Sequence, residues 1–222
     1  MAVDPQHDAA PRALPTRHSA VPADPLTPIG DFPPFHRFWQ YWMRDHASVR
    51  VVLPNTYRVD ADVWRGGHPG RGQLKRLKAQ GIATILNLRG GHDTVSNATE
   101  RALCAELDLP LLHLGMRATA LPRREVLQDL LTLLREVPKP VFLHCKSGAD
   151  RTALAVTLYL HVIKGQPLAE ARRAFSWRYG HIRWGKARPL HQFLDAYAAA
   201  QAETGIGFEE WLDRHYDPAA LS

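Results

Sequence analysis

The chain has 222 residues, enough for one domain with a sizeable core and additional tails, and its 45% of hydrophobic residues is normal for a soluble globular protein. No apolar run is long enough to span a bilayer and two cysteines cannot form a disulfide framework, which argues against a membrane-spanning chain and a disulfide-rich secreted domain. The 28 Lys and Arg residues outnumber the 22 Asp and Glu residues, and the formal charge of +6 favours anionic partners such as phosphorylated small molecules, phosphoproteins, anionic lipid or nucleic acid.

The first 54 residues are expected to precede the main domain. Residues 1–34 are rich in Pro and Ala without a hydrophobic period, which predicts a disordered tail with no secretory signal. Residues 35–54 form a helical lead-in, with aromatic and basic side chains mixed over 35–49. These aromatic side chains either pack on the domain or bind a membrane surface.

From residue 55 to about residue 200, strand-like runs alternate with helix-like runs. The expected strands cover 57–59, 63–64, 82–88, 111–114 and 140–144, and the expected helices cover 72–80, 98–107, 123–136, 152–163, 168–178, 189–201 and 208–215. The last of these belongs to a helical extension over 201–222. This alternation predicts an α/β fold in which helices flank a central, largely parallel sheet.

One segment carries recognisable chemistry, His144-Cys145-Lys146-Ser147-Gly148-Ala149-Asp150-Arg151-Thr152. It follows an expected strand and opens an expected helix, a position where backbone N–H groups and the helix dipole together bind a phosphate dianion. The same field favours a thiolate at Cys145, which would be the nucleophile. Gly148 lets the loop close around the anion without a Cβ in the way.

The flanking side chains each have a role in this interpretation. Arg151, six residues after Cys145, can hold two phosphate oxygens with its planar fork. The Thr152 hydroxyl can stabilise the sulfur as a leaving group, and His144 can polarise the loop through a hydrogen bond. Lys146, Ser147, Gly148 and Ala149 would bind the phosphate together with Arg151. The alternative is a buried, inert Cys145 beside a solvated Arg151.

The segment resembles the signature loop of the protein tyrosine phosphatase superfamily, His-Cys-x5-Arg-Ser/Thr. The stretch from Val63 to Pro69 (VWRGGHP) and the strand from Thr84 to Arg89 (TILNLR) look like the atypical dual-specificity phosphatase branch. The resemblance covers roughly residues 55–197. It implies a single α/β phosphatase domain of the dual-specificity type, a cysteinyl-phosphate intermediate, and no metal or other cofactor.

The expected general acid is missing from its usual place. The family normally carries this Asp on a mobile loop before the signature helix, but here residues 115–122 read GMRATALP. Asp150, inside the signature loop, is the candidate acid, because a carboxylate beside a bound phosphate can protonate the leaving oxygen. It could instead point away and pair with a nearby Arg. Glu125 and the pair His92 and Asp93 are weaker candidates.

Two features bear on the substrate. Lys146, directly after Cys145, resembles the loop of phosphoinositide phosphatases, although Ala149 stands where that pattern has a second Lys. Between residues 171 and 188 there are six basic and no acidic residues, interleaved with three aromatic ones. This stretch is either a rim for a polyanionic substrate or lipid surface, or a solvated basic face.

Cysteine usage bears on location. Cys145 needs a free thiol, which indicates a reducing compartment and a cytoplasmic location, with peripheral attachment to a membrane surface as the alternative. Cys104, in an expected helix, is interpreted as a small core residue, and a resolving role toward oxidised Cys145 is the alternative.

The sequence therefore predicts a phosphatase of phosphotyrosine or phosphoserine/threonine proteins. The first alternative is the same chemistry on a phosphoinositide, an inositol phosphate or a phospholipid head group. The second is a catalytically weak module that binds a phosphorylated partner. The spacing of six residues between Cys145 and Arg151 fits a rhodanese-type sulfurtransferase less well than a phosphatase. No nucleic-acid partner is expected, because the basic stretch comes with no nucleic-acid-binding motif.

Overall fold

A five-stranded sheet forms the centre of the protein, seen here in a computed structural model that describes residues 55–92, 94–182 and 185–221. The predicted tail over 1–34 and the predicted lead-in over 35–54 lie outside the described residues. The strands, in chain order, are β1 Thr56–Arg58, β2 Val63–Gly66, β3 Thr84–Asn87, β4 Leu111–His113 and β5 Val141–His144.

The spatial order of the strands is β1-β2-β5-β3-β4. Only β1 runs antiparallel, against β2, and the pairs β2–β5, β5–β3 and β3–β4 are parallel. The central strands β3 and β5 are buried at every residue, which explains why apolar residues stand next to one another in both strands instead of alternating with polar ones. The predicted α/β class with a largely parallel sheet is confirmed.

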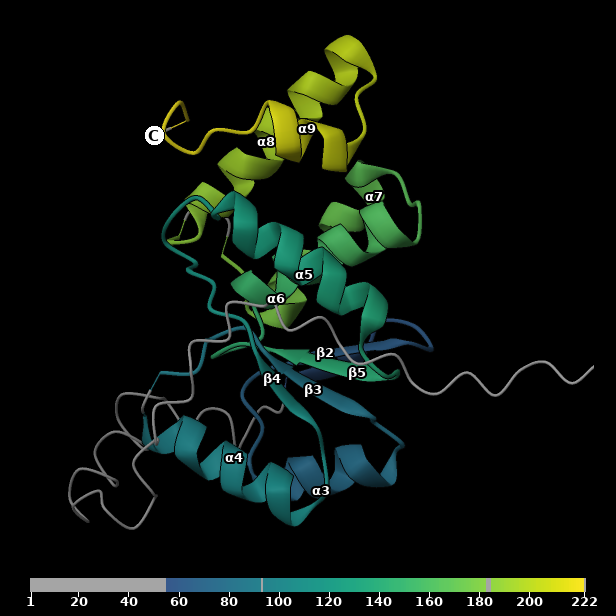
Figure 1. Ribbon diagram of the computed structural model, residues 1–222, viewed down its shortest axis with the longest axis vertical. Helices are drawn as coiled ribbons and strands as arrows, with labels where there is room; N and C mark the ends of the chain where they lie inside the picture. The colour runs from purple at the N-terminus through teal and green to yellow at the C-terminus, as the bar shows by residue number, and fades with distance from the viewer. Residues whose placement is uncertain (1–54, 93, 183–184, 222) are drawn as a thin grey trace, which may run out of the picture.

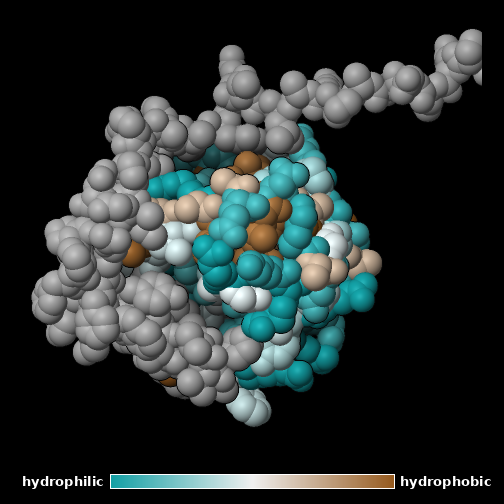
Figure 2. Space-filling view, turned by 90° about the horizontal axis from the view of Figure 1, so that it is seen from below, coloured by the Kyte–Doolittle hydropathy of each residue, from teal (hydrophilic) through white to brown (hydrophobic). Residues whose placement is uncertain are grey.

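Helices cover both faces of this sheet (Figure 1). They are α3 Arg71–Ala79, α4 Val95–Glu106, α5 Arg124–Glu136, α6 Asp150–Leu158, α7 Leu168–Ala171, α8 Arg188–Thr204 and α9 Phe208–Arg214. Helices α3 and α4 lie on one face, and α5 to α9 lie on the other (Figure 1). The described part of the surface seen from the α3–α4 side is mostly hydrophilic (Figure 2).

Each face of the sheet has its own apolar core. The larger one joins α5, α6, α8 and α9, and its aromatic members Phe193, Tyr197, Phe208 and Trp211 pack ring against ring. The smaller one joins α3 and α4 to the central strands β3 and β5 through Ile85 and Phe142. Helix α8 runs across residue 200, where the extension was expected to begin, and α9 packs into the same core as α8. Among the described residues, none of the helices is long and apolar enough to cross a membrane.

One predicted helix is wrong. Instead of a continuous helix over 168–178, α7 ends at Ala171, a 3-10 turn follows over Arg172–Ala174, and a second one covers Trp177–Tyr179. The break falls at Phe175, whose ring packs 4.9 Å from His181 and 4.7 Å from His191. Tertiary packing of this one aromatic side chain thus overrides the helical periodicity. The predicted helix over 152–163 is helical throughout, but its last five residues, Tyr159–Ile163, form a π turn.

Candidate active site

The segment from Cys145 to Ala149 joins the end of β5 to the first residue of α6. Strand β5 lies between the parallel strands β2 and β3, so the segment starts at the carboxyl edge of the sheet. Ligands of open α/β sheets bind at this edge, and the N-terminus of α6 adds the positive end of a helix dipole. The predicted strand–loop–helix placement of Cys145 is confirmed.

Three consecutive carbonyl groups of this loop are held by the chain around β2. The backbone N–H of His68 donates to Lys146 O at 3.2 Å, Asn55 Nδ2 donates to Ser147 O at 2.7 Å, and Arg65 Nη2 donates to Gly148 O at 2.8 Å. In a trans peptide the N–H points opposite to the C=O. The next three N–H groups are therefore turned away from this scaffold, as a phosphate-binding loop requires.

Gly148 is the one loop position where a side chain would not fit. Its φ is +80°, in the left-handed region, and a Cβ there would lie 2.5 Å from the carbonyl carbon of Gly66 and 2.7 Å from the nitrogen of Gly67. The backbone of Gly66 and Gly67 therefore lies directly against the backbone of the loop at Gly148. The role that the sequence suggested for Gly148, a tight closure of the loop, has a direct steric basis here.

The Cys145 thiol lies at the base of the loop and is 2% exposed. Burial raises the pKa of this thiol, but the charge of Arg151 lowers it, as do the neighbouring polar groups of Thr152 and the N–H of Gly148. The net effect is a pKa below the ordinary value of 9.0. The loop therefore favours the thiolate, the form in which a cysteine is nucleophilic.

Arg151 lies in the first turn of α6 and reaches toward the stretch over 115–122. Its Nη1 donates to the carbonyl oxygen of Met116 at 3.3 Å. Met116 is anchored in turn by a backbone hydrogen bond to Leu88 O at 3.2 Å. The stretch that should carry the usual general acid therefore borders the loop, as predicted, but it contains no carboxylate.

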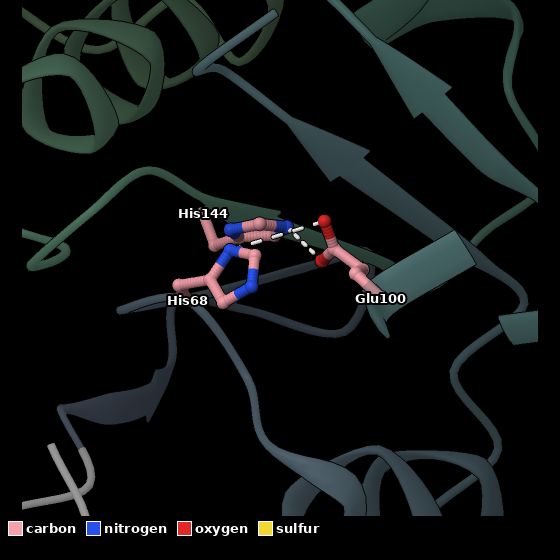
Figure 3. Close-up of side chains that lie close together, drawn as sticks. All are labelled: His68, Glu100 and His144. Atoms are coloured by element: carbon pink, nitrogen blue, oxygen red, sulfur yellow. Dashed lines mark ion pairs between the residues drawn. The ribbon is translucent and has the colours of Figure 1, made fainter. Parts of the chain in front are cut away.

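A buried ionic cluster lies beside the loop, and it was not predicted from the sequence. Glu100, on α4, lies 2.6 Å from His144 Nε2 and 3.8 Å from His68 Nδ1, and all three side chains are buried (Figure 3). His144 Nδ1 lies 3.2 Å from the carbonyl oxygen of Cys145. His144 thus connects the cluster to the backbone of Cys145, the contact that the expected polarising role needs.

Glu100 has a lowered pKa in this cluster. Burial raises the pKa, but the charges of His144 and His68, the close contact with His144 and a hydrogen bond from Asn87 lower it to about 2. The signal for Glu100 was a charge on an apolar helix face, since Leu103 and Cys104 follow it at the i+3 and i+4 positions.

The same three residues have the chemistry to hold a metal ion, because two imidazoles and a carboxylate come within ligand distance of one another. Arg89 opposes such a site. Its Nη1 lies 3.2 Å from His68 Nδ1, the nitrogen that faces Glu100. A guanidinium at this point repels a cation. We therefore interpret the cluster as a buried ion-pair network.

The candidate acids fall in different places. Asp150 points at the imidazole of His181, with Oδ1 2.7 Å from Nδ1, so its partner is a histidine rather than the arginine considered above. Glu125 is exposed in the first turn of α5, where a carboxylate complements the helix dipole. His92 is exposed, and Asp93 lies outside the described residues.

The basic stretch after α7 borders the loop. Asn55 Nδ2 joins it to the loop, donating to Tyr179 O at 2.8 Å as well as to Ser147 O. Two of its arginines are paired, Arg172 with Asp195 at 2.6 Å and Arg173 with Glu170 at 2.8 Å. Trp177 is 87% exposed, and Arg183 lies outside the described residues.

The remaining predicted residues take ordinary positions. Ser147 is exposed and Lys146 half-exposed at the loop surface, whereas Ala149 and Thr152 are buried. Cys104 is buried in the smaller core, where burial raises the pKa of its thiol to about 12, with a further contribution from the charge of Glu100. Cys104 is therefore a poor thiolate, which favours the interpretation as a core residue.

Comparisons with known proteins point to one family. A family model described as DSP-PTPase phosphatase fused to NAD+ kinase matches residues 42–181. The dual specificity protein phosphatase TpbA of Pseudomonas aeruginosa is 27% identical over 135 residues, which cover 60% of this chain and 59% of TpbA. The probable chloroplastic NAD kinase 2 of Oryza sativa subsp. japonica is 22% identical over 187 residues, which cover 82% of this chain but 19% of that protein. The chain thus spans little more than half of the one relative and about a fifth of the other.

Solved structures share the fold. The crystal structure of TpbA matches with a TM-score of 0.53 at 23% identity, over 67% of this chain and 91% of that chain. The crystal structure of PTPMT1 matches with a TM-score of 0.50 at 21% identity, over 67% and 99%. The predicted resemblance to the protein tyrosine phosphatase superfamily is confirmed: because the family model covers more than half of the sequence, this chain belongs to the family of DSP-PTPase phosphatases described as fused to NAD+ kinase.

Proposed function

We propose that this phosphatase hydrolyses phosphomonoesters of phosphorylated proteins through a cysteinyl-phosphate intermediate, with Cys145 as the nucleophile. The observation that carries the proposal is the lowered pKa of the Cys145 thiol within a loop whose carbonyl groups are tied back to a scaffold. A thiolate and a set of inward N–H groups at one point are what an attack on a phosphate dianion needs. The relation to TpbA, a dual specificity protein phosphatase, supports a phosphoprotein substrate.

In the first step the Cys145 sulfur attacks phosphorus. The S–P bond forms, the P–O bond to the leaving group breaks, and the departing oxygen takes a proton from Asp150. Arg151 and the N–H groups of Ser147, Gly148 and Ala149 balance the charge on the other phosphate oxygens, and Lys146 adds a positive charge at the rim. Preorganised charge of this kind supplies most of the catalysis in phosphoryl transfer.

In the second step water attacks the phosphocysteine. The water proton goes to the carboxylate of Asp150, the S–P bond breaks, and the Cys145 thiolate leaves with help from the hydroxyl of Thr152. The products are the dephosphorylated alcohol or phenol and inorganic phosphate, and Asp150 has recovered its proton. His144 acts only through the loop backbone, by holding the carbonyl of Cys145.

A second substrate class, a phosphoinositide or another phosphorylated lipid head group, is favoured by a different observation. The rim beside the loop carries exposed Arg178, Lys186 and Arg188, and the two large hydrophobic side chains Trp177 and Ile182 are 87% and 71% exposed. An exposed Trp among basic residues suits an anionic membrane surface.

A panel of phosphotyrosine, phosphoserine and phosphothreonine peptides and of phosphoinositides in vesicles, scored by phosphate release, separates these substrates. We expect the highest kcat/KM on phosphopeptides. A higher kcat/KM on phosphoinositides would instead identify the phosphorylated lipid as the preferred substrate class.

The catalytic role itself is tested with an aryl phosphate. Cys145→Ser should abolish turnover and Cys104→Ala should leave it unchanged, because the loop does not ionise a serine hydroxyl. Activity of Cys145→Ser within tenfold of the wild type would rule out the mechanism. Tight phosphopeptide binding with no turnover by the wild type would instead identify a phosphate-binding module.

A further inference from the structure

Three separate segments of the chain meet at His181. His181 follows the 3-10 turn Trp177–Tyr179, Asp150 opens α6, and His191 lies in the first turn of α8. The His181 side chain is 3% exposed, and both of its ring nitrogens have partners. Nδ1 lies 2.7 Å from Asp150 Oδ1, and Nε2 lies 2.8 Å from His191 Nε2. Phe175 packs against both rings, which fixes their planes.

The protons of this chain of contacts follow from the donor and acceptor rules. An ionised carboxylate only accepts, so His181 carries a proton on Nδ1 and donates it to Asp150. Two nitrogens 2.8 Å apart share one hydrogen. With its proton on Nδ1, a neutral His181 has its lone pair on Nε2 and accepts from His191. His191 therefore selects the tautomer of His181 that can donate to Asp150.

We propose that His181, backed by His191, is the positioning residue that aims the carboxyl group of Asp150 for proton transfer. The inference rests on the proposed function, in which Asp150 is the general acid. His181 does not touch the substrate, because its buried side chain has both ring nitrogens occupied. Asp150, whose side chain is 32% exposed, is the member of the set that can reach the leaving oxygen.

The contact works in both halves of the reaction. When Asp150 is protonated, the proton sits on Oδ2 and Oδ1 is the carbonyl oxygen, which accepts from His181. When Asp150 is ionised, Oδ1 accepts from the same N–H. The carboxyl group can therefore give its proton to the leaving oxygen and recover it from water without rotating. A catalytic group held in this way loses no orientation between steps.

A matched pair of substitutions separates this role from simple packing. His181→Phe keeps an aromatic ring beside Phe175 but removes the donor. His181→Asn places an amide N–H near the position of Nδ1 but removes the ring. The measurement is the ratio of kcat/KM on a nitrophenyl phosphate, which needs no proton, to kcat/KM on an alkyl phosphate, which does.

His181→Phe is expected to raise this ratio about tenfold or more, since loss of orientation at a reacting group has effects of that size, whereas His181→Asn keeps it within roughly threefold of the wild type. A packing role would give the reverse, a larger loss in His181→Asn that is equal on the two substrates. If His181→Phe fails to fold, the same comparison can be made at His191, the partner of His181, with the variants His191→Phe and His191→Gln. An unchanged ratio in the folded Phe variants overturns the proposal.

Two further variants identify the source of a failure. Asp150→Asn should raise the ratio by roughly 10² or more. If it does not, the acid role of Asp150 is wrong and the positioning role falls with it. If Asp150→Asn raises the ratio and His181→Phe does not, only the inference on His181 fails. His161 provides the control, because both of its ring nitrogens also have partners: one lies 2.7 Å from Gln166 O and the other 3.0 Å from the Tyr197 hydroxyl. The variant His161→Phe should leave the ratio unchanged.

Discussion

The guanidinium of Arg65 donates a hydrogen bond from Nη2 to the carbonyl oxygen of Gly148 at 2.8 Å, from a position that is 1% exposed. Its other arm, Nη1, donates to Ala174 O at 2.8 Å, and the Cζ atom of Arg65 lies 3.8 Å from the ring centroid of Tyr179. Burial lowers the pKa of Arg65 to about 10, while Tyr179 and the thiolate of Cys145 oppose the shift, so the side chain stays charged at neutral pH. One buried cation thus ties the phosphate-binding loop to the stretch after α7.

Arg65→Lys should weaken both the loop and the fold. An ammonium group can reach one of the two carbonyl oxygens but not both, and it loses the planar contact with Tyr179. A buried carbonyl left without a partner costs about 1–3 kcal/mol. We expect a lower midpoint of thermal unfolding and a fall of at least tenfold in kcat/KM, by analogy with a displaced catalytic group. Arg71→Lys, which alters an exposed pair with Glu106, is the control, and equal effects of the two variants would contradict the special role of Arg65.

Gly148→Ala should be far more damaging than Gly165→Ala. Both glycines have left-handed backbones, with φ of +80° and +71°, and a Cβ there costs roughly 1–2 kcal/mol in either case. Gly165 has open space around its Cβ position, whereas a Cβ on Gly148 meets the backbone of Gly66 at 2.5 Å. Urea unfolding of both variants should show the larger loss for Gly148→Ala, together with loss of phosphatase activity. Similar free energies of unfolding would mean that the loop can move away from β2.

The two thiols should differ sharply in reactivity at neutral pH. The lowered pKa of Cys145 increases its thiolate fraction, and the pKa of about 12 at Cys104 leaves almost none. Iodoacetamide should therefore alkylate Cys145 first, with a rate that rises with pH and levels off above the lowered pKa. Peptide mass spectrometry locates the label, and inorganic phosphate should protect Cys145 alone. Preferential labelling of Cys104 would show that the loop does not stabilise the thiolate.

Arg151→Lys should lower kcat on an aryl phosphate by roughly 10² or more, because the charge is kept but the two-pronged geometry is lost. Steady-state kinetics separate this effect from a loss of binding. A rise in KM with kcat unchanged would mean that Arg151 binds the ground state and the transition state equally. Arg135→Lys, in an exposed pair with Glu209, should change neither parameter.

The sequence was informative where the chemistry is local. The residues from His144 to Thr152 are consecutive, so their spacing alone predicts a strand, a loop and a helix with a nucleophile between them. Strands β3 and β5 were recognisable because burial on both faces places apolar residues next to one another in the sequence.

The supporting residues could not be predicted in the same way. Arg65, Glu100 and His181 reach the loop only because the strand order and the packing of α4 and α8 bring distant segments together. The sequence therefore does not reveal which groups these three side chains contact. Phe175 interrupts the predicted helix over 168–178 for a related reason, since its partners His181 and His191 follow later in the chain.

Glu100→Gln should remove a contribution to stability that depends on pH. Because the pKa of Glu100 falls from an ordinary 4.5 to about 2 on folding, its carboxylate stabilises the fold fully above pH 4.5, and this stabilisation is lost as the pH falls from 4.5 toward 2. Removing one partner of a buried ion pair costs roughly 3–5 kcal/mol, so the variant should be less stable by about that amount at neutral pH. The difference in free energy of unfolding between wild type and variant, measured by urea titration at several pH values, should shrink below pH 4.5.

Glu106→Gln, on the same helix but in an exposed pair with Arg71, should change stability by less than about 1 kcal/mol. A difference for Glu100→Gln that stays constant from neutral pH down to pH 2 would mean that Glu100 is not ionised in the folded protein, and His144 would then have no buried anion to hold it against the carbonyl of Cys145.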